Sequence, residues 1–319
     1  MMELFAVRNP GPMTTVQDLG RLAFLDRGVP LSGALDPFAC RVANLLVGNP
    51  EDAAVLEITV MGPTIEVLTP ADIALTGADM GMTINQAPIR AWRTVRANPG
   101  EVIRIPRAAS GCRAYLAVTG GIDVPLMMGS RSTFVRAKIG GVQGRGLIKG
   151  DILHRRAGSL LTRPRELPDE WIPRYAREIA LRAVPGPQDD AFREGIDAFF
   201  GASYEVTQQA DRMGCRLRGP AVHRDGESPE SIVTEPTMPG NVQVPADGQP
   251  IILLVEQTSG GYAKIATVIT ADLPNVAQAM PGNIVLFERV TLEDAHRLYR
   301  EQQKHLQQIR EHLKRVYGL

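Results

Sequence analysis

The sequence predicts a mainly β protein with some helix, built as two β-rich modules followed by a C-terminal helix. Its 31 glycines and 24 prolines are scattered, so they divide the 319 residues into short pieces. Many pieces are apolar and bounded by Gly, Pro, Asn or Asp, which is typical of short strands. A proline- and charge-rich stretch near the middle separates two such sets. Short strands with frequent turns favour a barrel or sandwich over a parallel sheet with crossover helices.

The expected strands share this apolar, turn-bounded pattern. They cover residues 54–60, 64–68, 101–105, 114–118, 251–256 and 263–269. Residues 36–47 predict a helix instead, because Asp36 can cap its start, Pro37 suits the first helical position and Gly48 can end it.

The module boundary is predicted within residues 163–177, where prolines alternate with charged residues as in a connector. We therefore expect an N-terminal β-rich module over 1–165, a linker over 166–180, a second β-rich module over 181–290 and a helix over 291–319.

The C-terminal helix has a capping signal at Thr291. Its seam positions recur in steps of four and three, at Ala295, Tyr299, Gln302, Leu306, Ile309, Leu313 and Val316, and the polar Gln302 interrupts this otherwise apolar heptad seam. Packing on its own chain is favoured, and a coiled coil with a partner stays open.

Composition excludes several classes of protein. The formal net charge is zero, which argues against nucleic acid or an anionic membrane as the main partner. The N-terminus lacks a secretory signal, and the apolar runs are too short to span a bilayer. Three distant cysteines form neither a metal knuckle nor a disulfide framework, which fits a reduced compartment. We therefore expect a cytoplasmic protein.

Several catalytic motifs are absent from the sequence. It contains no G-x-x-x-x-G-K-[ST], G-x-S-x-G or H-E-x-x-H pattern. The five histidines have no ligand spacing, so no metal site is expected. No Met-Lys-Met biotinylation site is present, so the chain is not itself a biotin carrier. Residues 140–146 are glycine-rich without a G-x-G-x-x-G pattern, which indicates a tight hairpin or a close backbone approach to a ligand.

Four clusters of polar residues and glycines are candidates for a site. The first covers residues 14–36 and holds Gln17, Asp18, Arg21 and Asp36 on a turn-rich backbone, as sites for small polar substrates do. For each aspartate alone, capping a turn or helix is the commoner role.

The second cluster, at 120–133, places Ser130 and Ser132 around Arg131, a combination suited to a carboxylate or phosphate. A solvated loop is an equal alternative. In the third, Asp211 and Arg212 form a local pair or point to opposite faces, one of them into a site.

The fourth cluster lies at 240–264. The carboxamides of Gln243 and Gln257 suit an amide or urea-like group. The hairpin Gly260-Gly261-Tyr262 lets backbone N–H groups approach a ligand oxygen. Lys264 could supply positive charge or, when desolvated, a base. Taken alone, a glycine hairpin with an exposed lysine is the simpler interpretation.

Together these stretches resemble the biotin-dependent carboxyltransferase A/B family, also called allophanate hydrolase subunit 2 or the KipA type. The similarity runs in family order from about residue 10 to 287. It is carried by residues 11–21, 32–36, 43–49, 56–57, 75–79, 115–122, 129–133, 211–214, 243–245 and 260–262. One departure is Ala263, where the family usually has proline; its loss loosens the turn.

The resemblance implies a cyclophilin-like β-barrel architecture and an enzyme subunit. The first hypothesis is the C component of an ATP-dependent 5-oxoprolinase, which hydrolyses 5-oxo-L-proline to L-glutamate. Its implied partners are a KipI-type (allophanate hydrolase subunit 1) protein and a LamB/YcsF-type protein, and the ATP site is shared or lies on a partner. The alternatives are carboxyl transfer to urea or another amide from carboxybiotin on a separate carrier, and a KipA-type regulator without enzymatic activity that antagonises a kinase inhibitor.

Under the first hypothesis, Gln243, Gln257 and the backbone of the Gly260-Gly261 pair hold the amide. Arg131 or Arg212 holds the carboxylate, and Asp18 or Asp36 transfers protons. We further expect Gln17, Asp18 and Arg21 to line one wall of a site completed by the second module and by a partner chain.

Overall fold

A computed structural model describes residues 2–226 and 231–318. The chain divides into two compact units. Unit 1 comprises residues 1–23, 32–175 and 305–319, and unit 2 comprises residues 24–31 and 176–304. Both units are built mainly of strands, which confirms the predicted fold class.

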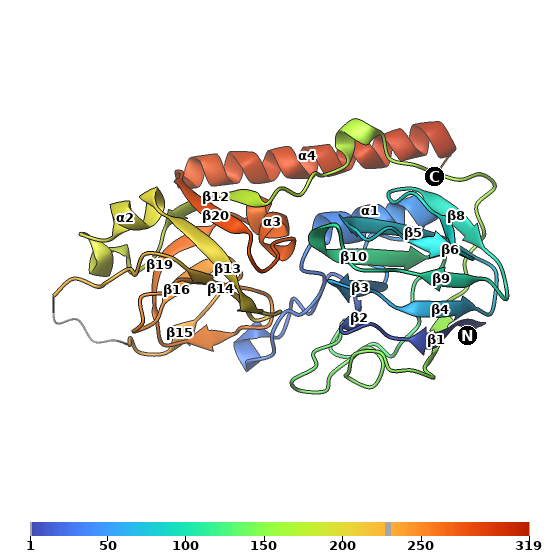
Figure 1. The fold of residues 1–319 in the computed structure, drawn as a ribbon, viewed down its shortest axis with the longest axis horizontal. Coiled ribbons are helices and arrows are strands. Elements are labelled where there is room, and N and C mark those ends of the chain that lie inside the picture. The colour runs from blue at the N-terminus through green and yellow to red at the C-terminus, as the bar shows by residue number, and fades with distance from the viewer. Residues whose placement is uncertain (1, 227–230, 319) are drawn as a thin grey trace. The chain divides into compact units, whose positions relative to one another are not determined.

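Unit 1 contains two antiparallel sheets (Figure 1). The first has the order β11 (Ile152–Arg155), β1 (Met2–Asn9), β4 (Thr64–Val67), β9 (Val102–Arg104), β6 (Thr83–Ile84), β7 (Ala87–Pro88). The second has the order β2 (Thr14–Gln17), β3 (Val55–Thr59), β10 (Ser110–Val118), β5 (Ala71–Asp79), β8 (Thr94–Ala97). The strands predicted at 54–60, 64–68, 101–105 and 114–118 are therefore present as β3, β4, β9 and β10.

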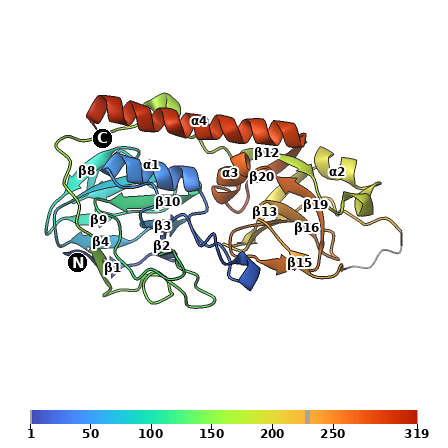
Figure 2. The same ribbon diagram turned by 180° about the vertical axis from the view of Figure 1, so that it is seen from behind.

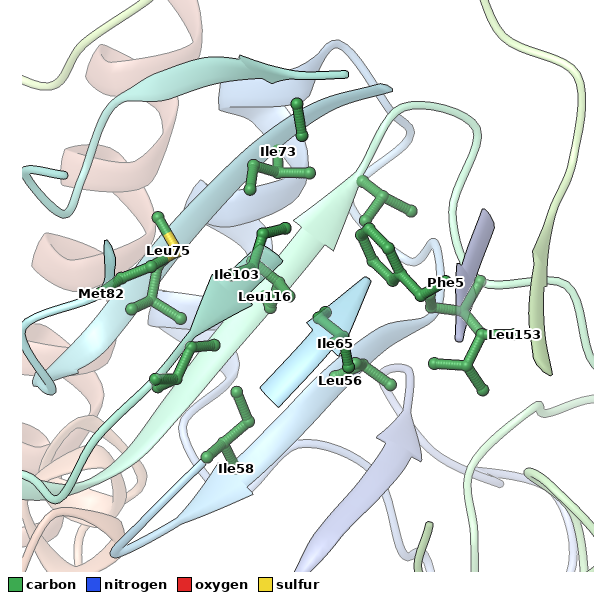
Figure 3. Packing of buried hydrophobic residues seen from close by; sticks show 14 of the residues in the cluster. Phe5, Leu56, Ile58, Ile65, Ile73, Leu75, Met82, Ile103, Leu116 and Leu153 are labelled. Carbon is green, nitrogen blue, oxygen red and sulfur yellow. The ribbon is translucent and has the colours of Figure 1, made fainter. Parts of the chain in front are cut away.

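The main core of unit 1 lies between these two sheets. Phe5, Ile65 and Ile103 of the first sheet and Leu56 and Leu116 of the second belong to one buried cluster (Figure 3). Successive side chains of a strand point to opposite faces. On β10, Leu116 therefore enters this core while its neighbours contact the helical layer on the other face.

That layer begins with helix α1 (Pro37–Val47), which packs on β5 and β10. Asp36 caps the helix, since its Oδ1 accepts a hydrogen bond of 3.0 Å from Ala39 N, and Gly48 ends it with a left-handed φ of 79°. These are the roles predicted for both residues. Asn44 and Asn49 then tie the end of the helix to Ala53 O in the following loop and to Val118 O at the end of β10.

Helix α4 (Leu292–Tyr317) begins where the capping signal predicts, with Thr291 Oγ1 accepting from Asp294 N. Leu306, Ile309 and Leu313 are buried in the same cluster as α1, so this part of the helix packs on its own chain. The predicted seam is only partly buried, because Tyr299 and Val316 are 43% and 37% exposed.

Unit 2 is a closed barrel (Figure 2). Its strand order is β12 (Glu178–Pro185), β19 (Ala263–Val268), β16 (Asn241–Val244), β17 (Ile251–Leu253), β14 (Gly214–Arg218), β13 (Ser203–Ala210), β20 (Ile284–Arg289). The parallel pairing of β12 with β20 closes the ring, so no strand edge of the described barrel is left open. A separate two-stranded antiparallel sheet pairs β15 (Glu235–Pro236), which precedes β16 in the chain, with β18 (Ser259–Gly260), which follows β17.

The predicted strand at 251–256 is too long. Strand β17 ends at Leu253, because the chain turns so that Leu254 N donates to Met213 O and Glu256 reaches Arg212. The short helices are α2 (Ile196–Gly201), α3 (Leu273–Ala277) and the 3-10 turns η1 (Leu25–Arg27), η2 (Asp169–Trp171), η3 (Asp189–Phe192) and η4 (Thr270–Asp272).

None of the helices in the described part of the chain combines the length and apolar character that a membrane crossing requires. Within the described ranges, no group of three or more His, Cys, Asp and Glu side chains lies together as a metal site would.

Candidate functional site

In unit 1, Asp18 is the centre of a buried clasp, which we define as Asp18, Ser130, Arg131 and Ser132. Asp18 Oδ1 accepts hydrogen bonds of 2.6 Å from both serine hydroxyls, and Oδ2 accepts one of 2.5 Å from Arg131 N. Gly20 N adds a fourth bond to Oδ1, at 2.8 Å. The first two predicted clusters therefore meet here, and four donors already surround the carboxylate.

Gln17 and Arg21 extend the clasp by bonding to backbone. Gln17 Nε2 donates to Thr133 O at 3.1 Å, and its Oε1 accepts from Gly33 N. Arg21 is 1% exposed and donates to the carbonyls of Met127 and Ser132. These contacts join the segment after β2 to the loop at 127–133. They favour a role in holding the loop, and the substrate contact predicted for both residues stays a prediction.

The glycine-rich segment 140–146 closes over this clasp. A Cβ at Gly140 would lie 2.1 Å from Ser132 O and 2.4 Å from the Arg21 guanidinium. The residue also has a φ of +67°, which L side chains rarely adopt. This glycine therefore permits a close backbone approach to the clasp, and Gly144 N donates to Gly140 O in the turn that follows.

Asp36 belongs to a second buried network in unit 1. Its backbone N–H donates to Tyr115 Oη at 2.8 Å, and Tyr115 Oη donates to Glu57 Oε2 at 2.9 Å. Burial, and then the Glu57 carboxylate, raise the pKa of Tyr115 well above its usual value. Because the phenol stays protonated, it keeps donating to Glu57. The network fixes the entry to α1, and proton transfer by Asp36 stays a prediction.

In unit 2, Lys264 is the centre of the strongest polar cluster. Its side chain is 4% exposed, and Nζ lies 2.8 Å from Glu235 Oε1. Gln188 links the same groups, because its Nε2 donates to Glu235 Oε1 and its Oε1 accepts from Lys264 N. The hydrogen bond from Lys264 lowers the pKa of Glu235. The exposed lysine considered as the simpler alternative is wrong, because the Lys264 side chain is buried and its Nζ contacts Glu235 and the carbonyl of Pro236 in β15.

Gln243 lies directly opposite Lys264 in the pairing of β16 with β19. Its Nε2 donates to Tyr262 O at 3.3 Å. A Cβ at Gly260 would lie only 2.5 Å from that nitrogen, so the glycine leaves room for the carboxamide. The structure thus brings together Gln243, Gly260, Tyr262 and Lys264, as predicted from their spacing.

The other predicted residues of unit 2 have partners of their own. Arg212 and Glu256 form an ion pair of 2.5 Å between side chains that are 9% and 6% exposed. Asp211 Oδ1 accepts from Met213 N and Gly214 N in a turn. Gln257 Nε2 donates to Ser259 O. Holding a substrate carboxylate with Arg212 would require displacing Glu256 and so breaking a buried ion pair, which is destabilising. Substrate binding by Arg212 therefore stays a prediction.

Chemically, the unit 2 cluster offers one buried cation, Lys264, and a carboxamide, Gln243, packed against the glycine turn at Gly260. A buried ammonium beside a carboxamide is suited to an amide oxygen that becomes negative during reaction, because electrostatic stabilisation is strong where water is excluded. The barrel strands hold these groups on rigid backbone.

Comparison with known proteins identifies the family. Residues 27–289 match the family model described as carboxyltransferase domain, subdomain A and B. The chain belongs to this carboxyltransferase family. The family predicted from the sequence motifs is confirmed, and the matched range includes both clusters described above except Gln17, Asp18 and Arg21.

Relatives of this carboxyltransferase chain are enzyme components. It is 38% identical to the C component of 5-oxoprolinase from Escherichia coli over 302 residues, covering 94% of this chain and 95% of that protein. It is 35% identical to the protein of the same name from Haemophilus influenzae, covering 93% and 94%. The crystal structure of the K. lactis urea amidolyase superposes with a TM-score of 0.91 at 31% identity, covering 96% of this chain and 20% of that one.

Several site residues of this carboxyltransferase chain were missed from sequence. Glu57 carried a usable signal, since it is an acidic residue inside an apolar strand. Glu256 ended an expected strand. Gln188 and Glu235 gave no local signal, because only the folded barrel brings them to Lys264.

Proposed function

We propose that the chain is the C component of an ATP-dependent 5-oxoprolinase complex, which opens the lactam of 5-oxo-L-proline to give L-glutamate. The observation that carries this proposal is the end-to-end match to the C component of 5-oxoprolinase from Escherichia coli, at 38% identity over 94% of this chain and 95% of that protein.

Lys264 and Gln243 are the residues proposed to contact the lactam. Hydrolysis adds water across the ring C–N bond, so the carbonyl oxygen gains negative charge as the bond to the attacking oxygen forms. The ammonium of Lys264 would stabilise that charge, with Glu235 holding the ammonium in place at 2.8 Å. Gln243 would orient the amide. The absence of a side chain at Gly260 leaves room for the Gln243 carboxamide.

ATP is assigned to a partner subunit in this proposal. The buried cation of the unit 2 cluster, Lys264, faces Glu235, and the separate buried cation Arg212 faces Glu256, so neither fits a triphosphate. The proposed partners are a KipI-type and a LamB/YcsF-type protein. A cytoplasmic location is part of the proposal, since Cys40, Cys112 and Cys215 are buried thiols outside any disulfide, as suits a reducing compartment.

The test is reconstitution of the complex. The chain would be purified alone and with both partners, and 5-oxoproline-dependent ATP hydrolysis and glutamate formation would be measured. We expect turnover only with the partners present. Absence of activity in every combination of folded subunits would contradict the proposal.

Variants of Lys264 then test the site. Lys264→Met should lower kcat by about 10²–10³-fold, the range seen when one oxyanion-stabilising group is removed, while Lys264→Arg should retain part of the activity. Lys304→Met, at an exposed lysine of the same unit, is the matched control. Equal loss in both methionine variants would contradict the assignment.

A second candidate is the carboxyltransferase component of a biotin-dependent carboxylase acting on urea or another amide. It is supported by the TM-score of 0.91 to the K. lactis urea amidolyase over 96% of this chain. The same lysine and carboxamide would then hold the acceptor's carbonyl. Carboxylation of urea with a carboxybiotin carrier, and no 5-oxoproline turnover, would favour this candidate over the first.

A further inference from the structure

A cleft of about 690 Å³ lies in unit 1, beside the end of helix α1. Parts of residues 47–53 and 156–162 form its walls, with Thr119, Gly120, Arg131, Arg165, Tyr317 and Gly318. The volume is within the range of small-molecule sites. Every lining residue belongs to unit 1, so the cleft needs no other part of the chain.

The charges that line this cleft are mostly positive. Arg131, Arg156 and Arg165 contribute guanidinium groups, whereas Asp52 is the one carboxylate among the described lining residues. Behind the wall, the buried Arg155 donates to the carbonyls of Thr119 and Arg156, which adds further positive charge. The local excess of cations favours an anionic ligand.

Arg165 is buried at 8% exposure and has no ion pair with any described carboxylate. Arg165 Nη1 donates to Leu45 O, in the last turn of α1, at 3.1 Å. This bond uses one of the five N–H groups of the guanidinium. Burial lowers the pKa of Arg165, although nearby Asp72 opposes the shift. Asp72 is itself paired with Arg96 at 2.6 Å. A buried guanidinium without its own counter-ion is costly unless an anion joins it.

Arg131 is placed in the lining by the clasp. Its backbone N–H is fixed by Asp18 Oδ2, while its side-chain Nε is buried without a hydrogen-bond partner among the described residues. The Ser130-Arg131-Ser132 motif, whose residue types suit a carboxylate or phosphate, therefore presents its arginine to this cleft. Both guanidinium groups can make paired hydrogen bonds to a planar or tetrahedral anion.

Glycines without side chains leave the arginines of the cleft uncovered. A Cβ at Gly48 would lie 3.4 Å from Arg165 Nη1, so any larger side chain would cover the guanidinium. Gly120 and Gly158 pack backbone to backbone, since a Cβ at Gly158 would lie 2.9 Å from Gly120 N. The arginines are thus reachable by a ligand.

We propose that this cleft binds a small organic anion, carrying a carboxylate or a phosphate group, between Arg131 and Arg165. The site is separate from the lysine cluster in its residues, and the inference holds whether or not the complex hydrolyses 5-oxoproline. A carboxylate and a phosphate share the recognition chemistry, so the experiment distinguishes them.

The test is calorimetric titration of the full chain at fixed ionic strength with four probes: pyrophosphate, ATP, L-glutamate and 5-oxo-L-proline. We expect saturable 1:1 binding of either the phosphate pair or the carboxylate pair. Arg131→Gln should weaken it by at least about tenfold, the effect of losing a charge-assisted hydrogen bond. Arg131→Lys, which keeps the charge without the fork, should weaken it less.

Arg107→Gln is the matched control, because Arg107 is an exposed arginine of unit 1 outside the lining. Arg165→Gln tests the second guanidinium, with circular dichroism to verify folding because this residue also bonds to α1. Saturable binding lost in Arg131→Gln and kept in Arg107→Gln supports the site. No saturable binding of any probe, or equal weakening in the two variants, overturns it, and Arg165 is then a helix-end contact only.

Discussion

Replacing Asp18 by asparagine distinguishes a structural clasp from a proton-transfer group. The substitution keeps the size of the side chain and one acceptor oxygen but removes the charge. In the native protein the carboxylate receives four hydrogen bonds of 2.5 to 2.8 Å from Ser130, Ser132, Gly20 and Arg131. Asp18 is only 7% exposed, so water cannot replace these hydrogen bonds.

The expected cost follows from this geometry. With its oxygen at the Oδ1 position, the new carboxamide turns an NH2 group toward Arg131 N, so two donors face each other. One charge-assisted bond is lost at about 1.5–3 kcal/mol, and a buried N–H without an acceptor adds about 1–3 kcal/mol. We therefore expect Asp18→Asn to lower the free energy of unfolding of unit 1 by about 2.5–6 kcal/mol.

Tryptophan fluorescence during urea unfolding measures this change. The chain has two tryptophans, Trp92 and Trp171, and both belong to unit 1. The midpoint should fall by about 1–3 M urea for an ordinary dependence of stability on denaturant. Asp79→Asn is the control: Asp79 is exposed and accepts one bond of 3.3 Å from Gly81 N, so its midpoint should barely move.

The opposite result would refute the reasoning. If Asp18→Asn unfolds at the wild-type midpoint while turnover of the reconstituted complex is abolished, Asp18 acts in the chemistry and the clasp is incidental. Loss of both stability and activity, with partial recovery of both at low temperature, is the outcome expected of a structural residue.

Three further predictions use the same fold. Gly140→Ala should destabilise unit 1 by more than about 2 kcal/mol, since the new Cβ would lie 2.1 Å from Ser132 O; Gly150→Ala, at another positive φ but in open space, should cost only about 1–2 kcal/mol by the same fluorescence assay. Asp36→Ala should cost about 0.5–2 kcal/mol through loss of the α1 cap, and Asp36→Asn, which can still accept from the helix, should recover most of it in thermal unfolding. Burial raises the pKa of Tyr204 to about 12. The folded state therefore keeps the phenol proton, whereas the unfolded state releases it near pH 10. The stability that the protonated Tyr204 contributes is complete below about pH 10 and is lost as the pH rises through about 12. Tyr204→Phe should reduce the loss of stability between about pH 10 and 12 and leave stability at pH 7 nearly unchanged. Unfolding of unit 2, monitored by circular dichroism, measures this. An unchanged dependence of stability on alkaline pH would contradict the raised pKa of Tyr204.

Local patterns were enough to predict the elements of the fold that depend on neighbouring residues. The start and end of α1 are set by Asp36, Pro37 and Gly48 within its own segment, and the structure places them as expected. The start of α4 depends likewise on Thr291 and Asp294. Strand β17 was overestimated because Glu256 leaves the strand to pair with Arg212, a contact invisible in the apolar run.

The candidate site divides in the same way. Spacing along the chain singled out Lys264, Gln243 and the Gly260 hairpin, since each lies in an unusual polar and glycine-rich stretch. It did not reveal Glu235 or Gln188, because their surroundings in sequence are ordinary. Nor did it predict that Arg131 lines a cleft beside α1 rather than an undefined loop.

The family, the mainly β class, the capped helices and the polar stretches that hold the candidate residues could all be predicted from the sequence. Which polar groups become partners depends on contacts between distant parts of the folded chain. Asp18 meets Ser130 across 112 residues and Arg212 meets Glu256 across 44. The physical reason is that helix caps and strand patterns depend on near neighbours, whereas the partner of a buried charge is chosen by the closure of a barrel or the packing of two sheets. Asp18 and Asp36, candidates for chemistry in the linear sequence, are thereby held as a clasp and a helix cap in the folded chain.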